Sequence, residues 1–183
     1  MPAETSDVLT AADLLQMDMP GKSLELVQGR LVVREPPGVW HGKVAAKLTY
    51  LLGAFVYMNE LGVLCAQDTG FQIGTAPDTV RAPDVAFIAA ARTHVVVPSG
   101  YGTAAPDLVV EIVSPSDRPG EVLSKVGDWL EADARLVWVI DPMRASAQVH
   151  RADGSIALVA ADGVLDGEDV LAGFSLRLSE VLQ

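Results

Sequence analysis

The sequence has little cysteine, few aromatic residues and little positive charge. Cys65 is the only cysteine among 183 residues, so no disulfide can form within the chain, which fits a reducing compartment. Aromatic residues make up only 5% of the chain, but 50% of its residues are apolar, which is enough for a packed core. The formal net charge is −11, which argues against a general nucleic-acid coat, because such proteins bind phosphates through Lys and Arg. A local basic cleft or a metal-dependent site remains compatible with this charge.

Long hydrophobic runs are also missing from the sequence. No apolar stretch reaches the length that spans a bilayer, so we expect no membrane contact. The N-terminal segment lacks a basic start followed by an apolar run, so no signal peptide is predicted. With the single cysteine, these absences predict a cytoplasmic protein. No repeat, low-complexity tract or clear linker divides the chain, and we therefore expect a single domain over residues 1–183.

The first half of the chain alternates between helical and strand patterns. Thr10 is predicted to cap a short helix in AADLLQM, and LELVQGRLVV predicts a hairpin around Gln28-Gly29. Apolar residues recur at helical spacing from about 41 to 58. The runs VLCAQDTGFQI and TVRAPDVAFIA are predicted to be strands that pair across GTAPD as a second hairpin.

The second half continues the alternation. PDLVVEIVS predicts a buried strand, a helix is expected from about 120 to 132, and LVWVID predicts another buried strand. AQVHRADGSIALVAADG has the pattern of a hairpin with Asp-Gly at its turn. The whole order predicts an α/β (α+β) fold with a mixed central sheet, flanking helices and additional β-hairpins.

One carboxylate interrupts the buried strand at 108–113. Burying Glu111 among apolar residues is costly unless a partner compensates its charge. Side chains alternate along a strand, so Asp84 would come within about 5 Å of Glu111 if their strands were neighbours. Two carboxylates that close repel each other unless a proton or a cation lies between them. A hard divalent cation with oxygen ligands is the usual solution, and this predicts a metal site.

The predicted helix after this strand offers a second cation. Its apolar stripe leaves Lys125 on the flank, from which a long side chain can reach towards Glu111. Asp128, by contrast, is predicted to point almost directly away. Spacing alone favours an ordinary solvated lysine at this position.

Several segments together carry a family resemblance. LELVQGRLVV, HGKV, DTGFQI, RAPDVAF, PDLVVEIVSPSD, the Lys125 helix and LVWVIDP, in this order, resemble the Uma-two family of bacterial restriction-endonuclease-like proteins. The resemblance covers nearly the whole chain and implies the PD-(D/E)XK nuclease fold. That fold's pattern is an Asp on one core strand, then Asp or Glu with a Lys two residues later. Asp84 and Glu111 match it, Val113 stands at the lysine position, and the resemblance assigns the lysine role to Lys125.

The resemblance implies a metal-dependent endonuclease that hydrolyses phosphodiester bonds of DNA. Mg²⁺ (or Mn²⁺) would be bound by Asp84, Glu111 and a backbone carbonyl near Ile112, and Lys125 would orient the attacking water or offset charge. Glu25 matches a recurrent acidic position and is a candidate further ligand or water acceptor. His41 lies in the first turn of its helix, where it could reach the cleft, because helix starts attract phosphate.

Simpler interpretations of these residues and of the function remain open. Glu25 also fits a surface position of its hairpin, and His41 also fits a core or capping histidine. The alternative function is a non-catalytic, oligomeric binding or regulatory module that retains the nuclease fold, and the acidic charge and Val113 favour it. A second alternative is an enzyme acting on a small nucleotide or carbohydrate phosphate. The apolar content of the hairpins at 24–33 and 146–160 predicts a homodimer.

Overall fold

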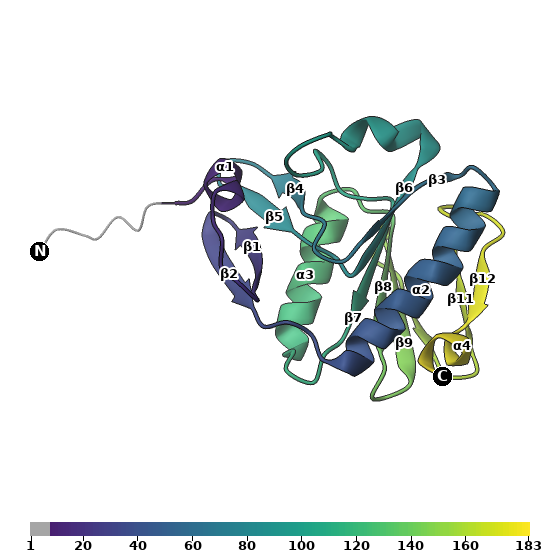
Figure 1. Cartoon of the computed structure of the whole chain (residues 1–183). Coiled ribbons are helices and arrows are strands. Elements are labelled where there is room, and N and C mark those ends of the chain that lie inside the picture. The colour runs from purple at the N-terminus through teal and green to yellow at the C-terminus, as the bar shows by residue number, and fades with distance from the viewer. Residues whose placement is uncertain (1–7) are drawn as a thin grey trace, which may run out of the picture.

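The structure is a computed structural model in which residues 8–183 are described. The N-terminal seven residues, over which the signal-peptide and domain predictions also extend, lie outside this part. A six-stranded mixed sheet forms the centre of the molecule (Figure 1). Its order is β10 (Ile156–Val159), β9 (Ser146–Arg151), β8 (Leu136–Asp141), β7 (Leu108–Ile112), β6 (Val85–Ala89) and β3 (Gly62–Ala66). β7 and β8 are parallel, and the other neighbours are antiparallel.

A second, antiparallel sheet packs beside the helix α3 (Pro119–Glu131) (Figure 1). Its order is β2 (Arg30–Arg34), β1 (Ser23–Val27), β5 (Thr79–Arg81) and β4 (Phe71–Gly74). The predicted hairpin around Gln28-Gly29 is confirmed, with positive φ values of 48° and 73° at these two residues. Two-residue hairpin turns need such values, which Gly adopts without steric cost.

The two strand runs at 63–73 and 79–89 differ from the prediction. The expected hairpin exists as β4 and β5, but each run is broken, and its other half joins the six-stranded sheet as β3 or β6. The breaks fall where the sequence places a turn at Asp68 to Gly70 and a proline at Pro83, which cannot donate to a ladder. Each of the two runs therefore crosses once between the sheets, and both of these crossings border the site described below.

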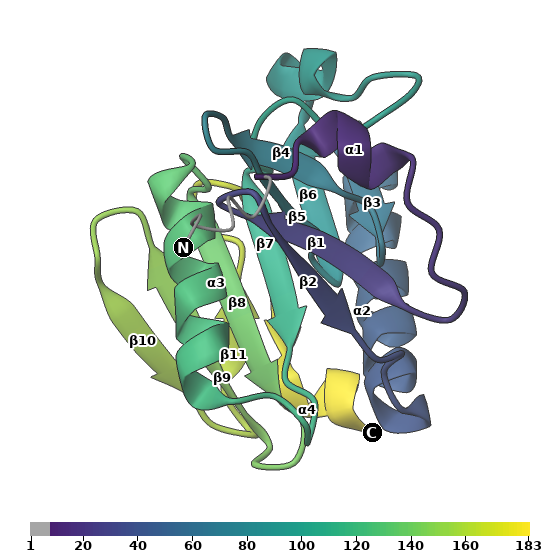
Figure 2. The ribbon, with the colours of Figure 1, turned by 90° about the vertical axis from the view of Figure 1, so that its left-hand side faces the viewer.

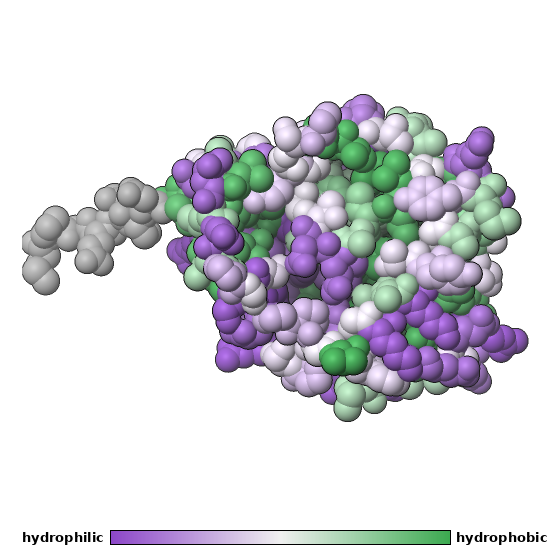
Figure 3. Space-filling view, viewed as in Figure 1, coloured by the Kyte–Doolittle hydropathy of each residue, from purple (hydrophilic) through white to green (hydrophobic). Residues whose placement is uncertain are grey.

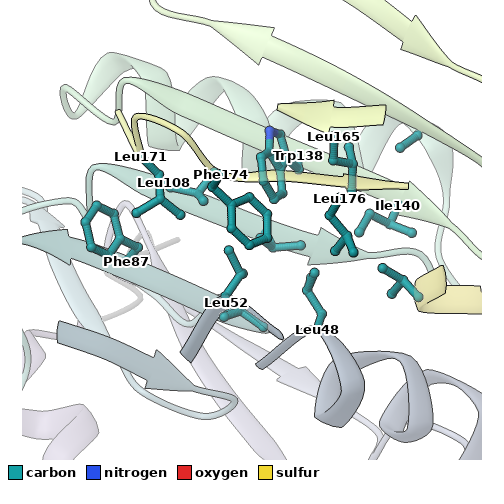
Figure 4. Close-up of a cluster of buried hydrophobic side chains, with 14 of the residues drawn as sticks. Leu48, Leu52, Phe87, Leu108, Trp138, Ile140, Leu165, Leu171, Phe174 and Leu176 are labelled. Carbon is teal, nitrogen blue, oxygen red and sulfur yellow. The ribbon is translucent and has the colours of Figure 1, made fainter. Parts of the chain in front are cut away.

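Helices cover both faces of the six-stranded sheet. On one face lie α2 (Val39–Met58), α4 (Leu178–Leu182) and the hairpin of β11 (Val164–Asp166) and β12 (Ser175–Arg177). Figure 4 shows the core they enclose, where Leu48 and Leu52 of α2 lie under the stacked rings of Trp138 and Phe174.

The other face of this sheet is covered by α3 (Pro119–Glu131) and by β4 of the second sheet. The short helix α1 (Ala11–Leu15) is capped by Thr10, as predicted, and packs on the four-stranded sheet. A 3₁₀ helix, η1 (Ala90–Val95), follows β6. The predicted mixed sheet with flanking helices is thus confirmed. In the described part of the chain, no helix combines the length and the apolar character needed to cross a bilayer.

Candidate active site

Asp84 and Glu111 are direct neighbours across two strands. β6 and β7 pair in antiparallel register with Val85 opposite Val110. Asp84 precedes β6 and continues the ladder, since its N–H donates to the carbonyl of Val110 at 3.1 Å. The next residue on each strand, Asp84 and Glu111, therefore face each other, as the sequence pattern predicts.

Three donors fix the carboxylate of Asp84. The backbone N–H of Ile112 donates to Oδ2 at 2.7 Å, and the Gln67 amide donates to Oδ1 at 3.0 Å. His41 Nε2 lies 3.2 Å from Oδ2. Burial alone would raise the pKa of Asp84, but hydrogen bonding and charge from His41, with charge from Lys125, outweigh it and lower the pKa. Asp84 is therefore held as an oriented carboxylate.

Both oxygens of Glu111 bind side chains of α3. Lys125 Nζ donates to Oε2 at 2.8 Å, and the Trp129 indole N–H donates to Oε1 at 2.7 Å. Lys125 and Trp129 are four residues apart, the spacing that places two side chains on one face of a helix. Burial raises the pKa of Glu111 to about 7, although the charge of Lys125 acts against this rise.

Lys125 lies where its flank position on the helix predicts. Its ammonium donates to the Ala82 carbonyl at 2.8 Å and to Glu111 at 2.8 Å, and it lies 3.1 Å from Glu25 Oε1. Two of the three donors of the ammonium are thus hydrogen-bonded, and Glu25 forms an ion pair with it. Burial opposes its charged form, but the charges of Glu111 and Glu25 outweigh burial and raise the pKa of Lys125. Lys125 is therefore a fixed positive charge rather than a base.

The interpretation of Glu25 as a surface residue of its hairpin is wrong. Its side chain is 2% exposed, because β1 is an interior strand that pairs with β2 on one side and β5 on the other. It accepts hydrogen bonds from the Ala82 N–H and from Arg81, each at 2.9 Å, and faces Lys125. Burial works to raise the pKa of Glu25, but Lys125 and Arg81 lower it to about 2.

Three further residues complete the network, and sequence reasoning missed each of them. Arg81 bridges Glu25 and Asp128, so the expectation that Asp128 points away from the site region is also wrong. Arg81 Nε donates to Asp128 Oδ2 at 2.8 Å. Trp129 lies on the apolar stripe of its helix, and its N–H must find an acceptor when the ring is buried. Gln67 carried no signal, because it lies at a crossing between sheets that the sequence does not reveal.

His41 is both a buried residue and a neighbour of the site. It lies in the first turn of α2, is 7% exposed and contacts Asp84. Burial works to lower the pKa of His41, but its interactions with Asp84 and with the backbone of Ile112 raise it.

The polar residues border a cavity of about 280 Å³. Figure 3 shows a recess near the centre of this face of the molecule, with hydrophilic side chains around it. The site residues that line the cavity are Glu25, His41, Gln67, Asp84, Glu111 and Lys125. A phosphate group entering here would meet Lys125 and three carboxylates, an arrangement that needs a further cation.

The donor set suits a hard divalent ion. Within residues 8–183, no three His, Cys, Asp or Glu side chains are arranged as a metal cluster. Asp84 and Glu111 offer oxygen ligands from two side chains only. Mg²⁺ is commonly held by one or two carboxylates together with water and substrate phosphate, whereas Zn²⁺ takes four ligands rich in nitrogen and sulfur. The residues therefore fit Mg²⁺. The backbone carbonyl of Ile112, which is the proposed third ligand, belongs to the peptide segment beside Asp84.

The chain belongs to the Uma2 family, described as "Putative restriction endonuclease", whose sequence profile matches residues 11–179. A crystal structure from Anabaena variabilis, titled as "a putative nuclease belonging to DUF820", has a similar fold, with a TM-score of 0.82 at 17% identity. The alignment covers 95% of this chain and 97% of that one. No curated protein matches the chain. The predicted restriction-endonuclease-like family and fold are thereby confirmed.

Proposed function

We propose that this protein is a Mg²⁺- or Mn²⁺-dependent endonuclease that hydrolyses phosphodiester bonds of DNA, acting in the cytoplasm as one domain over residues 1–183. One observation carries the proposal. Asp84 and Glu111 face each other across two strands, and Lys125 binds Glu111 from the helix although Val113 occupies the usual lysine position. Family membership supports a nuclease-like function in general terms.

Each residue has a distinct task in this mechanism. Asp84, Glu111 and the carbonyl of Ile112 would hold the ion, which when bound polarises the phosphate and lowers the pKa of a water molecule. His41, Gln67 and the Ile112 N–H keep the Asp84 carboxylate oriented.

Lys125 supplies positive charge beside the place where negative charge develops in the transition state. Its raised pKa keeps it protonated, so it cannot accept the proton of the attacking water. Its neighbour Glu25 is neutralised by Arg81 and Lys125, and therefore contributes by holding the lysine rather than by taking a proton.

Calorimetry and a cleavage assay test the proposal together. We expect Mn²⁺ binding and cleavage of a DNA panel by the native chain, and loss of both in Asp84→Ala and in Glu111→Ala. Glu131→Ala is the matched control, because Glu131 is an exposed carboxylate at the end of α3. Unchanged Mn²⁺ binding in both site variants would refute the assignment.

The non-catalytic alternative keeps one specific observation in its favour. Lys125 donates to Ala82 and Glu111 and forms an ion pair with Glu25, as expected for a lysine that only neutralises buried carboxylates. The same experiment separates the two functions. Mn²⁺ binding without cleavage of single-stranded DNA, double-stranded DNA or mononucleotide phosphates would favour the binding module.

A further inference from the structure

A second cavity, which the proposed mechanism does not use, adjoins the candidate active site. Its volume is about 480 Å³, and it lies between the first turns of α3 and the β8–β9 turn. In Figure 2, α3 lies across β8 and leaves β9 and β10 beyond its edge, with the start of α3 and the β8–β9 turn at the same end. We call this cavity the α3 groove.

The α3 groove and the site cavity are continuous. Val113, Ser114, Asp117 and Val122 line both of them. The strand register carries the same connection, since Glu111 of β7 is paired with Val139 of β8, a residue that lines the groove. One strand spacing, about 4.8 Å, therefore separates the backbone of Glu111 from that of Val139 on the groove floor.

The same row of residues continues to a polar group. Val139 is paired with Gln148 of β9, which also lines the groove. Gln148 is two strand spacings from Glu111, roughly 10 Å. A ligand reaching from the site to Gln148 thus spans the size of one nucleotide, with its charged end at the carboxylates and lysine.

The walls of the α3 groove suit a flat aromatic ring. Leu123 and Met143 line it from the helix and from the turn, and they are 55% and 73% exposed. A thioether makes favourable contacts with aromatic rings, and an exposed Leu and Met gain from being covered. Gln148 Oε1 lies 3.0 Å from His150 Nε2, and its amide N–H groups remain to donate to the edge of such a ring.

We propose that the α3 groove binds the unpaired nucleobase next to the scissile phosphate, so that the substrate of this site is single-stranded or locally unpaired nucleic acid. The proposal rests on the proposed function and narrows its substrate class. A base inside a duplex must unpair and unstack before it can enter a groove beside the scissile phosphate, at a free-energy cost that an unpaired base avoids. The net charge of −11 agrees, because it disfavours a long electrostatic track for duplex DNA and leaves affinity to contacts with the base.

Binding of a mononucleotide tests the groove without any cleavage. With Mg²⁺ present, methyl NMR spectra of the chain would be titrated with deoxyadenosine 5′-monophosphate and with deoxyribose 5-phosphate, which lacks the base. We expect shifts at Leu123 and Met143 and at least tenfold tighter binding of the nucleotide. The double variant Leu123→Ser/Met143→Ser should lose at least tenfold of this affinity. Tyr50→Ser/Met58→Ser is the control, since both residues are exposed on α2 outside the groove.

A cleavage assay separates this inference from the proposed function. With Mn²⁺ present, we expect an intact single strand to be cut at least tenfold faster than the same sequence as a duplex or with abasic residues. Equal rates on all three substrates, or equal binding of nucleotide and base-free sugar phosphate, would overturn the groove assignment while leaving a nuclease. Nucleotide binding in the groove without cleavage of any substrate would instead refute the nuclease and retain the groove.

Discussion

At the scale of single residues, burial disfavours the charged form of Glu111. Its pKa is about 7 in the folded chain, against an ordinary value of 4.5. Between these pH values the folded state keeps a proton that the unfolded state releases. The folding free energy therefore weakens as the pH rises from 4.5 through 7, and the loss is complete above 7.

We predict that Glu111→Gln removes this pH dependence. The difference of about 2.5 pH units corresponds to about 3 kcal/mol, at 1.36 kcal/mol for each unit. Urea unfolding of both proteins at pH 5 and pH 8, with chelator present, measures it. Between pH 5 and pH 8, the free energy of unfolding of the native chain should fall by most of this amount relative to that of the variant. If the difference in unfolding free energy between the two proteins is the same at both pH values, burial does not raise the pKa of Glu111.

Lys125 is expected to stabilise the fold as well as the site. Lys125→Met keeps most of the side-chain volume but leaves Glu25 and Glu111 without their shared cation. Removing one partner of a buried ion pair typically costs several kcal/mol, and we expect a loss of about 3 kcal/mol at pH 8. Lys47→Met is the control, because Lys47 is half-buried on α2 and forms no ion pair in the described chain. A loss below 1 kcal/mol in Lys125→Met would contradict the buried network.

The sequence predicted some of these residues better than others, for a physical reason. Asp84, Glu111 and Lys125 could be placed because strand alternation and helix spacing fix directions over a few residues. The partners Arg81, Gln67 and Trp129 depend on how separate elements meet, which no local spacing specifies. The surface interpretation of Glu25 failed in the same way, since only the pairing of β1 with β5 buries it.

At the scale of elements, Glu25 links the two sheets. It lies on β1 of the four-stranded sheet and binds Ala82 and Arg81, which lead from β5 into β6, as well as Lys125 of α3. The broken strand runs explain why this linkage was not predicted. Continuous apolar runs predict that strands form there. The division of each run between two sheets follows from long-range pairing, which these runs do not reveal.

We predict that Glu25→Gln weakens the contact between the sheets at neutral pH. The pKa of Glu25 falls from 4.5 to about 2 on folding, so its charge contributes stability above pH 4.5 that is lost as the pH falls through 2. We expect a cost of about 3 kcal/mol at pH 7. The cost should shrink towards pH 2 in urea unfolding. Glu35→Gln, at an exposed position after β2, should change stability by less than about 1 kcal/mol. A cost for Glu25→Gln that does not change with pH would point to packing rather than charge.

At the scale of the whole molecule, the two edges of the six-stranded sheet differ. At the edge formed by β3, the Tyr57 hydroxyl of α2 engages the outward-facing backbone groups of Leu64, lying 3.4 Å from both its N and its O. At the other edge, Arg151 N–H donates to the Ser155 carbonyl across the hairpin. Hydrogen-bonded pairs alternate along an antiparallel ladder, so the backbone groups of Ile156 and Leu158 point to the open side of β10. Their side chains are 58% and 81% exposed.

We expect the homodimer predicted from the apolar hairpins to form through β10. Two antiparallel copies related by a twofold axis would place Ile156 opposite the partner's Leu158, so that the unpaired groups of each copy satisfy those of the other. Light scattering at high micromolar concentration should give the mass of a dimer for the native chain and of a monomer for Leu158→Pro, which removes an edge donor. Tyr50→Ser, exposed on α2, should remain dimeric. A monomeric native chain would rule out the dimer, and a dimeric Leu158→Pro would place the interface elsewhere.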